Sequence, residues 1–484
     1  MNENIEIAAA PAETGKEEKA VFCTFTESIF AVIFLFAGYF FIKLFITNSC
    51  GIAAAVYLEG VLVCSALLAH FRNASGSRYS KLYFVLSVIF SLGVGMTSSG
   101  YLQFMELCFG AVFYAMWAFA LNNPEWHGFG DQTFRSVKEA ILGASVKNFS
   151  ACPKAAAGLF RRSSKNIGYI VIGLGISLPV TAVVCGLLIS ADSNFENMLE
   201  ELLRGISFEE PVVFLFGLPL SFFIFSIIFT AVNTEGNPRL GESFYVKFAP
   251  PALVCSMVLP LCAVYMLFFF SQLGYFLSAF GGVLPEGFSA SEYARQGFFE
   301  LCAVAVINLG VIALINLIAE SGKALKVMTV ILSVFTLILI ATAQSKMFLY
   351  IKEYGLTPKR VYTSWLMFIL AAVFVLIIIF CFKKFNAARI GAGIITAAAL
   401  LLGFCGVDPL IARYDASLIE SGVMSDFPED LSADAALVIS ECRSSENERL
   451  SSAAQRYREE LLPVISEKDP FERTVSDIIA WKLA

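Results

Sequence analysis

The sequence predicts an all-α protein, namely a polytopic helical membrane bundle of about 11 transmembrane helices with a small helical extracytoplasmic C-terminal tail. Three observations predict this class. Of the 484 residues, 57% are hydrophobic and only 15% are charged, whereas soluble domains carry roughly 25% charged residues. Long apolar runs recur along the chain. From Val407 onward, 16 acidic residues face 8 basic ones, although the net charge of the whole chain is only −6.

The apolar runs define three segments. Residues 1–26 are acidic and precede a run too long for a signal-peptide core, so we expect a cytosolic N-terminal tail and a retained first helix. Residues 27–406 form the transmembrane domain, and residues 407–484 form an acidic helical tail. A bilayer core needs about 20 apolar residues per helix. The runs that qualify are 27–47, 51–70, 82–97, 101–121, 167–191, 212–232, 250–272, 296–319, 327–349, 361–382 and 389–406.

The basic residues orient these spans. With the N-terminus inside, the inner segments hold 19 Lys and Arg residues and the outer loops hold 6. Cytoplasmic loops carry such an excess in membrane proteins. We therefore expect a cytoplasmic N-terminus and an extracytoplasmic C-terminus, in the plasma membrane of a bacterium.

The longest inner segment, 122–166, is basic and amphipathic. It holds seven Lys and Arg residues and an apolar stripe of Phe134, Val137, Ile141 and Leu142. Such a helix can lie on a membrane surface and bind anionic lipid headgroups. The alternative is a solvated linker with some helical content.

The stretch GLTPKR, residues 355–360, has the chemistry of a turn between two helices. Gly355 suits the left-handed residue that ends a helix, Thr357 is a good N-cap and Pro358 suits the first helical position. Tyr354 belongs to the aromatic belt expected at a membrane interface. One helix therefore ends at Gly355 and the next begins at Thr357.

The cations of this turn are the main exception to the charge asymmetry. Since the acidic tail is the nearest large opposite charge, we expect Arg360, and with it Lys359, to contact tail carboxylates or a turn at Asp408–Arg413. The alternative is an anchor to lipid headgroups. Within the tail, Ser432 is expected to cap a packed helix.

Five polar side chains lie inside the apolar runs, where ionisable groups are costly and raise a functional hypothesis. They are Lys43, Glu59, Glu106, Asn308 and Asn316. Lys43 and Glu59 lie at similar depth on adjacent antiparallel helices, so they can pair; the alternative for Lys43 is snorkelling to the headgroups. Interhelical hydrogen bonds account for the two asparagines.

Other classes of site have little support. Most of the 12 cysteines lie in apolar runs, no CxxC occurs and only two histidines are present, so we expect no metal site and no cofactor. No catalytic triad motif or phosphate-binding loop is visible. No basic stripe with aromatic residues indicates nucleic-acid binding.

Three motifs occur in order: SEYARQGFFELCAVAVINL, YGLTPKRVYTSW and VDPLIARYDAS. Together they resemble an uncharacterised family of multi-spanning membrane proteins of Firmicutes-type bacteria, a domain of unknown function of the 4153/4173 type, over roughly residues 165–425. Asp415 departs from the Asn expected there. The resemblance implies no known activity, cofactor or partner. It favours these outer-face candidates for a functional site: Glu300, Tyr354, Gly355, Thr357, Arg360, Asp408 and Arg413.

The sequence favours a non-enzymatic protein of envelope sensing or assembly, which acts through the outer-face motifs, the tail and a membrane-protein partner. A transporter or flippase-like permease using Lys43, Glu59 and Asn316 is the alternative. A membrane-embedded enzyme acting on a lipid or envelope precursor comes third, with Arg360 and Arg413 as phosphate ligands and Glu300 as acid or base. A polar cavity reaching the midplane would indicate transport, and carboxylates and arginines around an outer pocket would indicate an enzyme.

Overall fold

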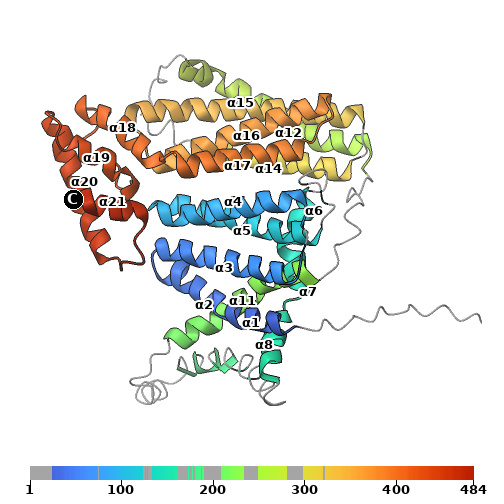
Figure 1. Cartoon of the computed structure of the whole chain (residues 1–484). Coiled ribbons are helices and arrows are strands. Elements are labelled where there is room, and N and C mark those ends of the chain that lie inside the picture. Colours follow the sequence, from blue (N-terminus) through green and yellow to red (C-terminus); the bar gives the residue numbers. More distant parts are fainter. Residues whose placement is uncertain are drawn as a thin grey trace, which may run out of the picture.

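The computed structural model describes residues 24–123 except Ser75, then 126, 128, 133–161, 209–233, 249–280, 298–319 and 322–483, together with scattered positions between 173 and 189. Throughout this part of the chain the regular structure is helical (Figure 1). The only β-type contact recorded there is an isolated bridge between Ala249 and Ala319. The predicted all-α class is confirmed.

Ten helical segments of the described residues are long and apolar enough to cross a membrane. The first consists of α1 (Phe25–Leu35), α2 (Ala37–Ile42) and a π-helical turn, η1 (Lys43–Thr47). The others are α3 (Ile52–Phe71), α4 (Arg78–Met96), α5 (Gly100–Asn122), α11 (Glu209–Asn233), α12 (Pro251–Phe280), α14 (Phe298–Ile318), α15 (Lys323–Tyr354), α16 (Pro358–Phe382) and α17 (Ala387–Phe404). The span expected at 167–191 lies mostly outside the described residues.

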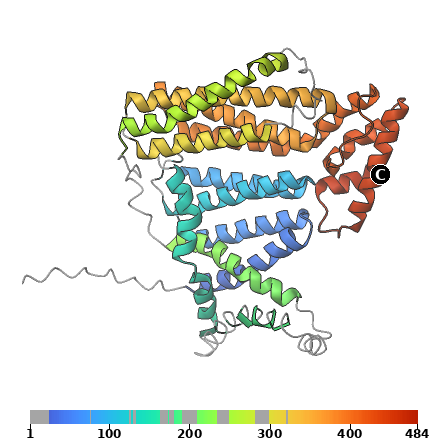
Figure 2. The ribbon, with the colours of Figure 1, turned by 180° about the vertical axis from the view of Figure 1, so that it is seen from behind.

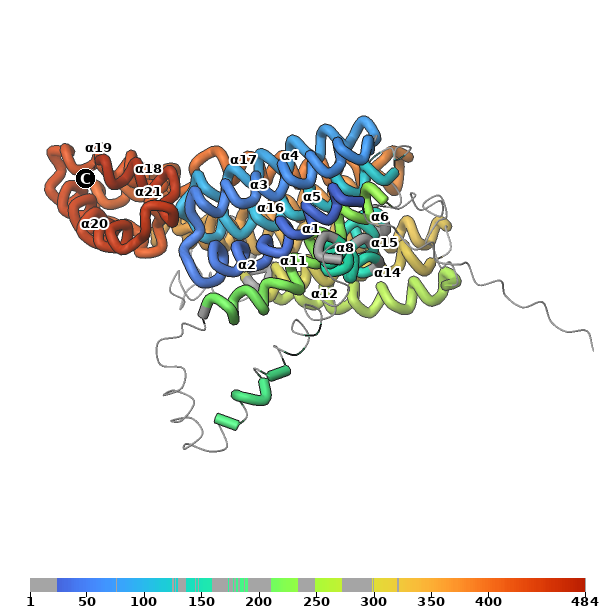
Figure 3. The backbone as a smooth tube through the Cα atoms, turned by 60° about the horizontal axis from the view of Figure 1, so that its bottom comes forward, coloured from blue at the N-terminus to red at the C-terminus, as the bar shows by residue number. Residues whose placement is uncertain are grey.

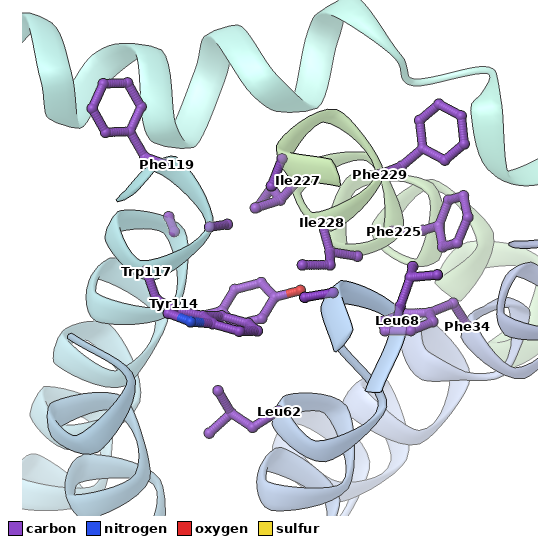
Figure 4. Packing of buried hydrophobic residues seen from close by; sticks show 14 of the residues in the cluster. Phe34, Leu62, Leu68, Tyr114, Trp117, Phe119, Phe225, Ile227, Ile228 and Phe229 are labelled. Atoms are coloured by element: carbon purple, nitrogen blue, oxygen red, sulfur yellow. The ribbon is translucent and has the colours of Figure 1, made fainter. Parts of the chain in front are cut away.

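The spans form two halves with separate hydrophobic cores (Figure 2). The first half, α1–α5 with α11, encloses a core rich in aromatic side chains (Figure 4). In this core the hydroxyl groups of Tyr114 and Ser65 share a hydrogen bond of 2.9 Å. The second half, α12 and α14–α17, encloses a core built from α12, α14, α15 and α16. Between the halves, α17 packs against α4 and α5 (Figure 1). The membrane-spanning part is therefore two packed units that meet mainly along α17.

The basic segment docks on the first half. It contains α6 (Thr133–Lys138), η2 (Glu139–Gly143), α7 (Ala144–Lys147) and α8 (Ala151–Arg161). Val137 and Ile141 of the expected apolar stripe pack against the first core, whereas Leu142 is exposed; the side chain of Phe134 lies outside the described set. Part of the stripe thus contacts protein. Binding of anionic headgroups by this segment stays a prediction.

The last four helices form the tail, defined here as residues 407–483. They are α18 (Val407–Glu420), α19 (Ala436–Cys442) after a short 3₁₀ turn η4 (Ala433–Ala435), α20 (Glu448–Glu467) and α21 (Val475–Leu483). The tail lies across one end of the bundle, which we call the tail end, and spans both halves (Figures 1 and 3). Its apolar core also contains Leu102 of α5 and Leu402 of α17. One cluster of side chains therefore joins the tail to each half.

Candidate functional site

The GLTPKR segment forms the expected turn at the tail end. Gly355 caps α15 with a φ of 74°, a left-handed conformation that favours glycine. The Thr357 hydroxyl accepts a hydrogen bond from the Arg360 N–H at 3.4 Å, and Pro358 is the first residue of α16. The predicted roles of these residues as helix caps are confirmed.

Arg360 does not bind a tail carboxylate, so that part of the prediction is wrong. Its Nη1 donates to the carbonyl oxygens of Tyr354 at 2.8 Å and Gly355 at 2.5 Å, and its guanidinium lies 4.2 Å from the centre of the Tyr350 ring. The last carbonyls of α15 lack partners within the helix and carry its negative dipole end. They are nearer to Arg360 than any tail acid and bind it instead.

The turn nevertheless contacts the tail, through neighbours of Arg360. Asp415 of α18 accepts a hydrogen bond from the Leu356 N–H at 2.8 Å. The Lys359 ammonium lies 3.7 Å from Asp430, which confirms a cation–carboxylate contact at this turn. A Cβ at Gly355 would lie 2.3 Å from the Met424 sulfur and 2.7 Å from Oδ1 of Asp415, so a larger residue here would displace both tail side chains. An Asn at position 415 would accept the same hydrogen bond.

Asp408 lies in the first turn of α18, where a turn had been expected over Asp408–Arg413. That expectation is wrong, because Gly406 with a φ of 68° starts a helix and Asp408 and Pro409 occupy its favourable first positions. The buried Asp408 carboxylate accepts hydrogen bonds from the backbone N–H of Ser432 at 3.1 Å and from the Ser432 hydroxyl. Asp408 therefore fixes η4 to α18.

Asp434 of η4 holds the tail to the first half. It accepts hydrogen bonds from the Ser98 N–H at 2.9 Å, the Ser98 hydroxyl at 3.2 Å and the Thr97 hydroxyl, all in the turn between α4 and α5. Two backbone bonds add to this contact, from Ile52 N–H to Arg473 O at 3.1 Å and from Ala53 N–H to Phe471 O at 3.2 Å. The tail thus binds the turns of both halves.

Burial controls the charge of the tail carboxylates. Burial raises the pKa of Asp408 to about 6, hydrogen bonds from Ser432 oppose the shift, and the nearby Asp434 and Asp430 carboxylates add to it. Burial also raises the pKa of Asp415 to about 6, against the hydrogen bond from Leu356 and the Arg360 charge. One oxygen of each carboxylate is buried without a hydrogen-bond partner. Both acids therefore bind a proton at higher pH in the docked tail than a solvated Asp does.

Glu106 lies beneath the tail, where the two halves meet. Its side chain is fully buried and neither carboxylate oxygen has a hydrogen-bond partner. Glycines face it from both halves, since a Cβ at Gly93 of α4 or at Gly403 of α17 would lie 2.5 Å and 2.7 Å from its Oε1 atom, respectively. The carboxyl group fills a slot that side chains at these positions would close.

Lys43 and Glu59 are not a pair, contrary to the expectation from their depth. The Lys43 ammonium lies 2.7 Å from Oε1 of Glu210 at the start of α11, and Tyr39 donates to the second oxygen of Glu210 at 2.5 Å. Oε1 of Glu59 is buried without a hydrogen-bond partner. The first span packs on α11 as well as on α3. The carboxylate that pairs with Lys43 therefore comes from α11, which is distant in the sequence, and not from the adjacent helix α3.

The two asparagines of α14 have different environments. Asn308 is buried, accepts a hydrogen bond from Tyr265 of α12 at 2.6 Å and donates to Thr336 of α15 at 2.9 Å. The interhelical bonding predicted for it is confirmed. Asn316 instead donates to the Ile312 carbonyl of its own helix at 2.8 Å, so the interhelical prediction is wrong there.

The remaining candidates do not converge on one pocket. Glu300 and Tyr354 are exposed, in the first turn of α14 and at the end of α15, and Arg413 lies on the exposed side of α18. Among the described residues no group of three His, Cys, Asp or Glu side chains is arranged to hold a metal ion. A separate apolar cavity of about 300 Å³ lies between α3, α4, α5 and α11. The hydroxyls of Ser87, Tyr57 and Tyr114 on its walls bond to protein atoms.

Three functional contacts were not predicted from the sequence. Asp434 and Asp415 dock the tail, and Glu210 pairs with Lys43. Asp434 follows the Ser432 cap by two residues. An acidic residue is common in the first turn of a helix, so its position gives no sign of a contact with the bundle. Asp415 carried a signal, since it departs from the Asn expected in its motif. Glu210 lies in an acidic stretch before an apolar run and resembles an ordinary solvated loop residue.

The fold and its spans define an integral, multi-pass membrane protein of the all-α class whose tail caps one end of the bundle. The chain belongs to the family described as Domain of unknown function (DUF4153), whose model matches residues 60–442. The match covers all three motifs of the sequence resemblance and extends it toward the N-terminus. No curated protein matches the chain, and no solved structure matches it.

Proposed function

We propose that this membrane protein is a non-enzymatic component of envelope sensing or assembly, with the tail as its interaction module. The observation that carries the proposal is the placement of the tail on the turns of both halves, through Asp434 on one side and Asp415 on the other. The halves have separate cores and meet mainly along α17. A partner that binds or displaces the tail therefore changes how the halves are held together.

The proposed orientation places the tail outside the cytoplasm, in a bacterial plasma membrane. α1 begins at the end of the bundle opposite the tail (Figure 1). That same end carries the cations Arg72, Arg78, Lys81, Lys323, Lys326, Lys383, Lys384 and Arg389. An excess of Lys and Arg near the ends of the spans is typical of the cytoplasmic side.

A transporter remains the second candidate, because α15 carries a row of buried polar side chains in the second half. Thr329, Ser333 and Thr336 recur at helical spacing, and Thr336 bonds to Asn308. The hydroxyls of Thr329 and Ser333 have no hydrogen-bond partner. A polar row inside a bundle is a feature of solute or ion pathways.

The enzyme interpretation has less support. The Arg360 guanidinium is bound to backbone carbonyls, and Arg413 is exposed on the outer side of α18. Of the two arginines expected to bind phosphate, Arg360 thus caps a helix end and Arg413 faces the surface. We therefore favour a protein without catalytic activity of its own.

Complementation of a deletion strain tests the two leading functions against each other. Asp434→Arg replaces the acceptor of Ser98 with a cation and releases the tail, whereas Glu429→Arg makes the same charge change on an exposed residue nearby. Asn308→Leu with Thr336→Val removes the polar pair of the second half. Sensing or assembly through the tail predicts that only Asp434→Arg fails to restore growth under envelope stress, at equal protein level. Failure of the Asn308/Thr336 variant alone would favour transport and contradict the proposal.

A further inference from the structure

Glu106 is the most unusual ionisable group of the described residues. It belongs to α5 of the first half, yet its carboxyl group contacts the backbone of α17 in the second half at Gly403, and α4 at Gly93. Its side chain is 0% exposed and both oxygens lack hydrogen-bond partners. An ionised carboxylate without partners in such a place is strongly unfavourable, because no water or protein group replaces its hydration. The closed contact therefore accepts Glu106 only as the neutral acid.

The charged groups around the slot do not compensate an anion. α4 and α17 carry their cations Arg78, Lys81 and Arg389 at the end opposite the tail. The tail contributes Asp434, whose negative charge acts on Glu106. From α16 comes the Tyr362 hydroxyl, which is bonded to Ser99 at 3.0 Å, and from α18 comes Asp408, which is bonded to Ser432. The charge that acts on Glu106 from the tail is therefore that of an acid, so repulsion adds to the cost of burial.

We propose that Glu106 is a proton-binding site at the contact between the two halves, and that release of this proton opens the contact. Binding is protonation of a carboxylate oxygen and release returns the proton to water. Because the slot excludes the anion, loss of the proton favours an arrangement in which water reaches the carboxylate. Since the slot is formed by glycines from both halves, that arrangement requires α17 to move from α4 and α5. The site is independent of the function proposed for the tail.

A tryptophan at the same contact reports opening. Trp365 of α16 packs against both the first core and the core of the tail, and its indole N–H donates to Ala398 of α17 at 3.2 Å. In a chain whose other three tryptophans are Phe, quenching of Trp365 by a water-soluble quencher measures access to the contact. The protonated carboxyl group itself is measured by its C=O stretch in the infrared spectrum.

The test compares Glu106→Gln with Glu59→Gln in purified protein in lipid nanodiscs. Glu106→Gln keeps shape and neutrality, so we expect it to fold, to lose one protonated-carboxyl band and to keep Trp365 protected at every pH. The parent chain should lose that band and gain quenching together as pH rises, and Glu59→Gln should follow the parent chain. Gly403→Ala crowds the carboxyl group from the second half and should raise quenching at all pH values. If Glu106→Gln keeps the band or shows the quenching profile of the parent chain, the proposal is wrong.

Discussion

At the scale of single residues, the turn between α15 and α16 shows how cations can be held at an end of the bundle where the charge asymmetry predicts few of them. The Arg360 guanidinium donates hydrogen bonds to two carbonyl oxygens at the end of α15 and lies over the Tyr350 ring. A planar guanidinium can make both contacts at once, whereas a Lys ammonium is a point charge on a flexible stem. The ion pair that does reach the tail, from Lys359 to Asp430, is largely exposed.

The two cations of the turn should therefore respond differently to substitution. Arg360→Lys loses at least one hydrogen bond and the ring contact, which we expect to cost about 1–2 kcal/mol of local stability. Lys359→Ala removes an exposed pair and should cost below about 1 kcal/mol. Protease cleavage between α18 and α19, compared at equal expression, measures both. Cleavage of Arg360→Lys at the rate of the parent chain, with faster cleavage of Lys359→Ala, would show that only the charge of the turn matters.

At the scale of elements, the tail is held by helix ends and turns rather than by one continuous helix face. The docking carboxylates Asp415 and Asp434 accept the backbone N–H groups of Leu356 and Ser98. Asp408 accepts that of Ser432 within the tail itself. Acceptors of this kind stay in place whether or not the acid is ionised, but ionisation in a buried position is unfavourable. Docking of the tail should consequently depend on pH.

The sign of this dependence follows from the two raised pKa values. The pKa values of Asp408 and Asp415 lie near 6 when the tail is docked, above the usual 3.8, so the docked state binds more protons between these limits. The packing of η4 on α18 through Asp408 and the docking of α18 through Asp415 are therefore strongest below about pH 4. Both weaken as pH rises through about 6, by at least about ten-fold per carboxylate. Hydrogen exchange of α18 and α19, corrected for its intrinsic pH dependence, measures the effect.

Asp408→Asn provides the control for that measurement. The amide keeps an acceptor for Ser432 but cannot ionise, so the variant should lose about half of the pH dependence while the tail stays docked. Exchange that slows as pH rises, or a pH dependence unchanged by Asp408→Asn, would contradict this assignment.

At the scale of the whole molecule, the spans and the caps of the GLTPKR turn could be predicted because apolar length and local turn chemistry specify them. What could not be predicted depends on which helices become neighbours. Lys43 pairs with Glu210, which is 167 positions later in the chain, and Asp434 binds a turn more than 330 positions earlier. The sequence shows that Glu106 is an ionisable residue inside an apolar run. It does not show the slot around Glu106, because that slot is formed by Gly93 and Gly403 of other helices.

The orientation of the whole molecule is a prediction of the charge asymmetry and can be measured directly. A reporter fused after Asn166 should report the cytoplasm, because it follows the basic segment, and one fused at Val407 should report the outside. The matched pair controls for expression, since both fusions follow complete spans. Cytoplasmic signals from both positions would show that the number of crossings between them is even.

The position of the tail after both halves in the chain has a consequence for biogenesis. Domains of a nascent chain generally fold in the order of synthesis, and almost all of the first core comes from residues before 233. The second half follows, and the tail that joins the two is made after both. A chain that stops before the tail then carries two bundles that meet mainly along α17. Membrane proteases can distinguish such a copy by the exposed turns that the tail would cover.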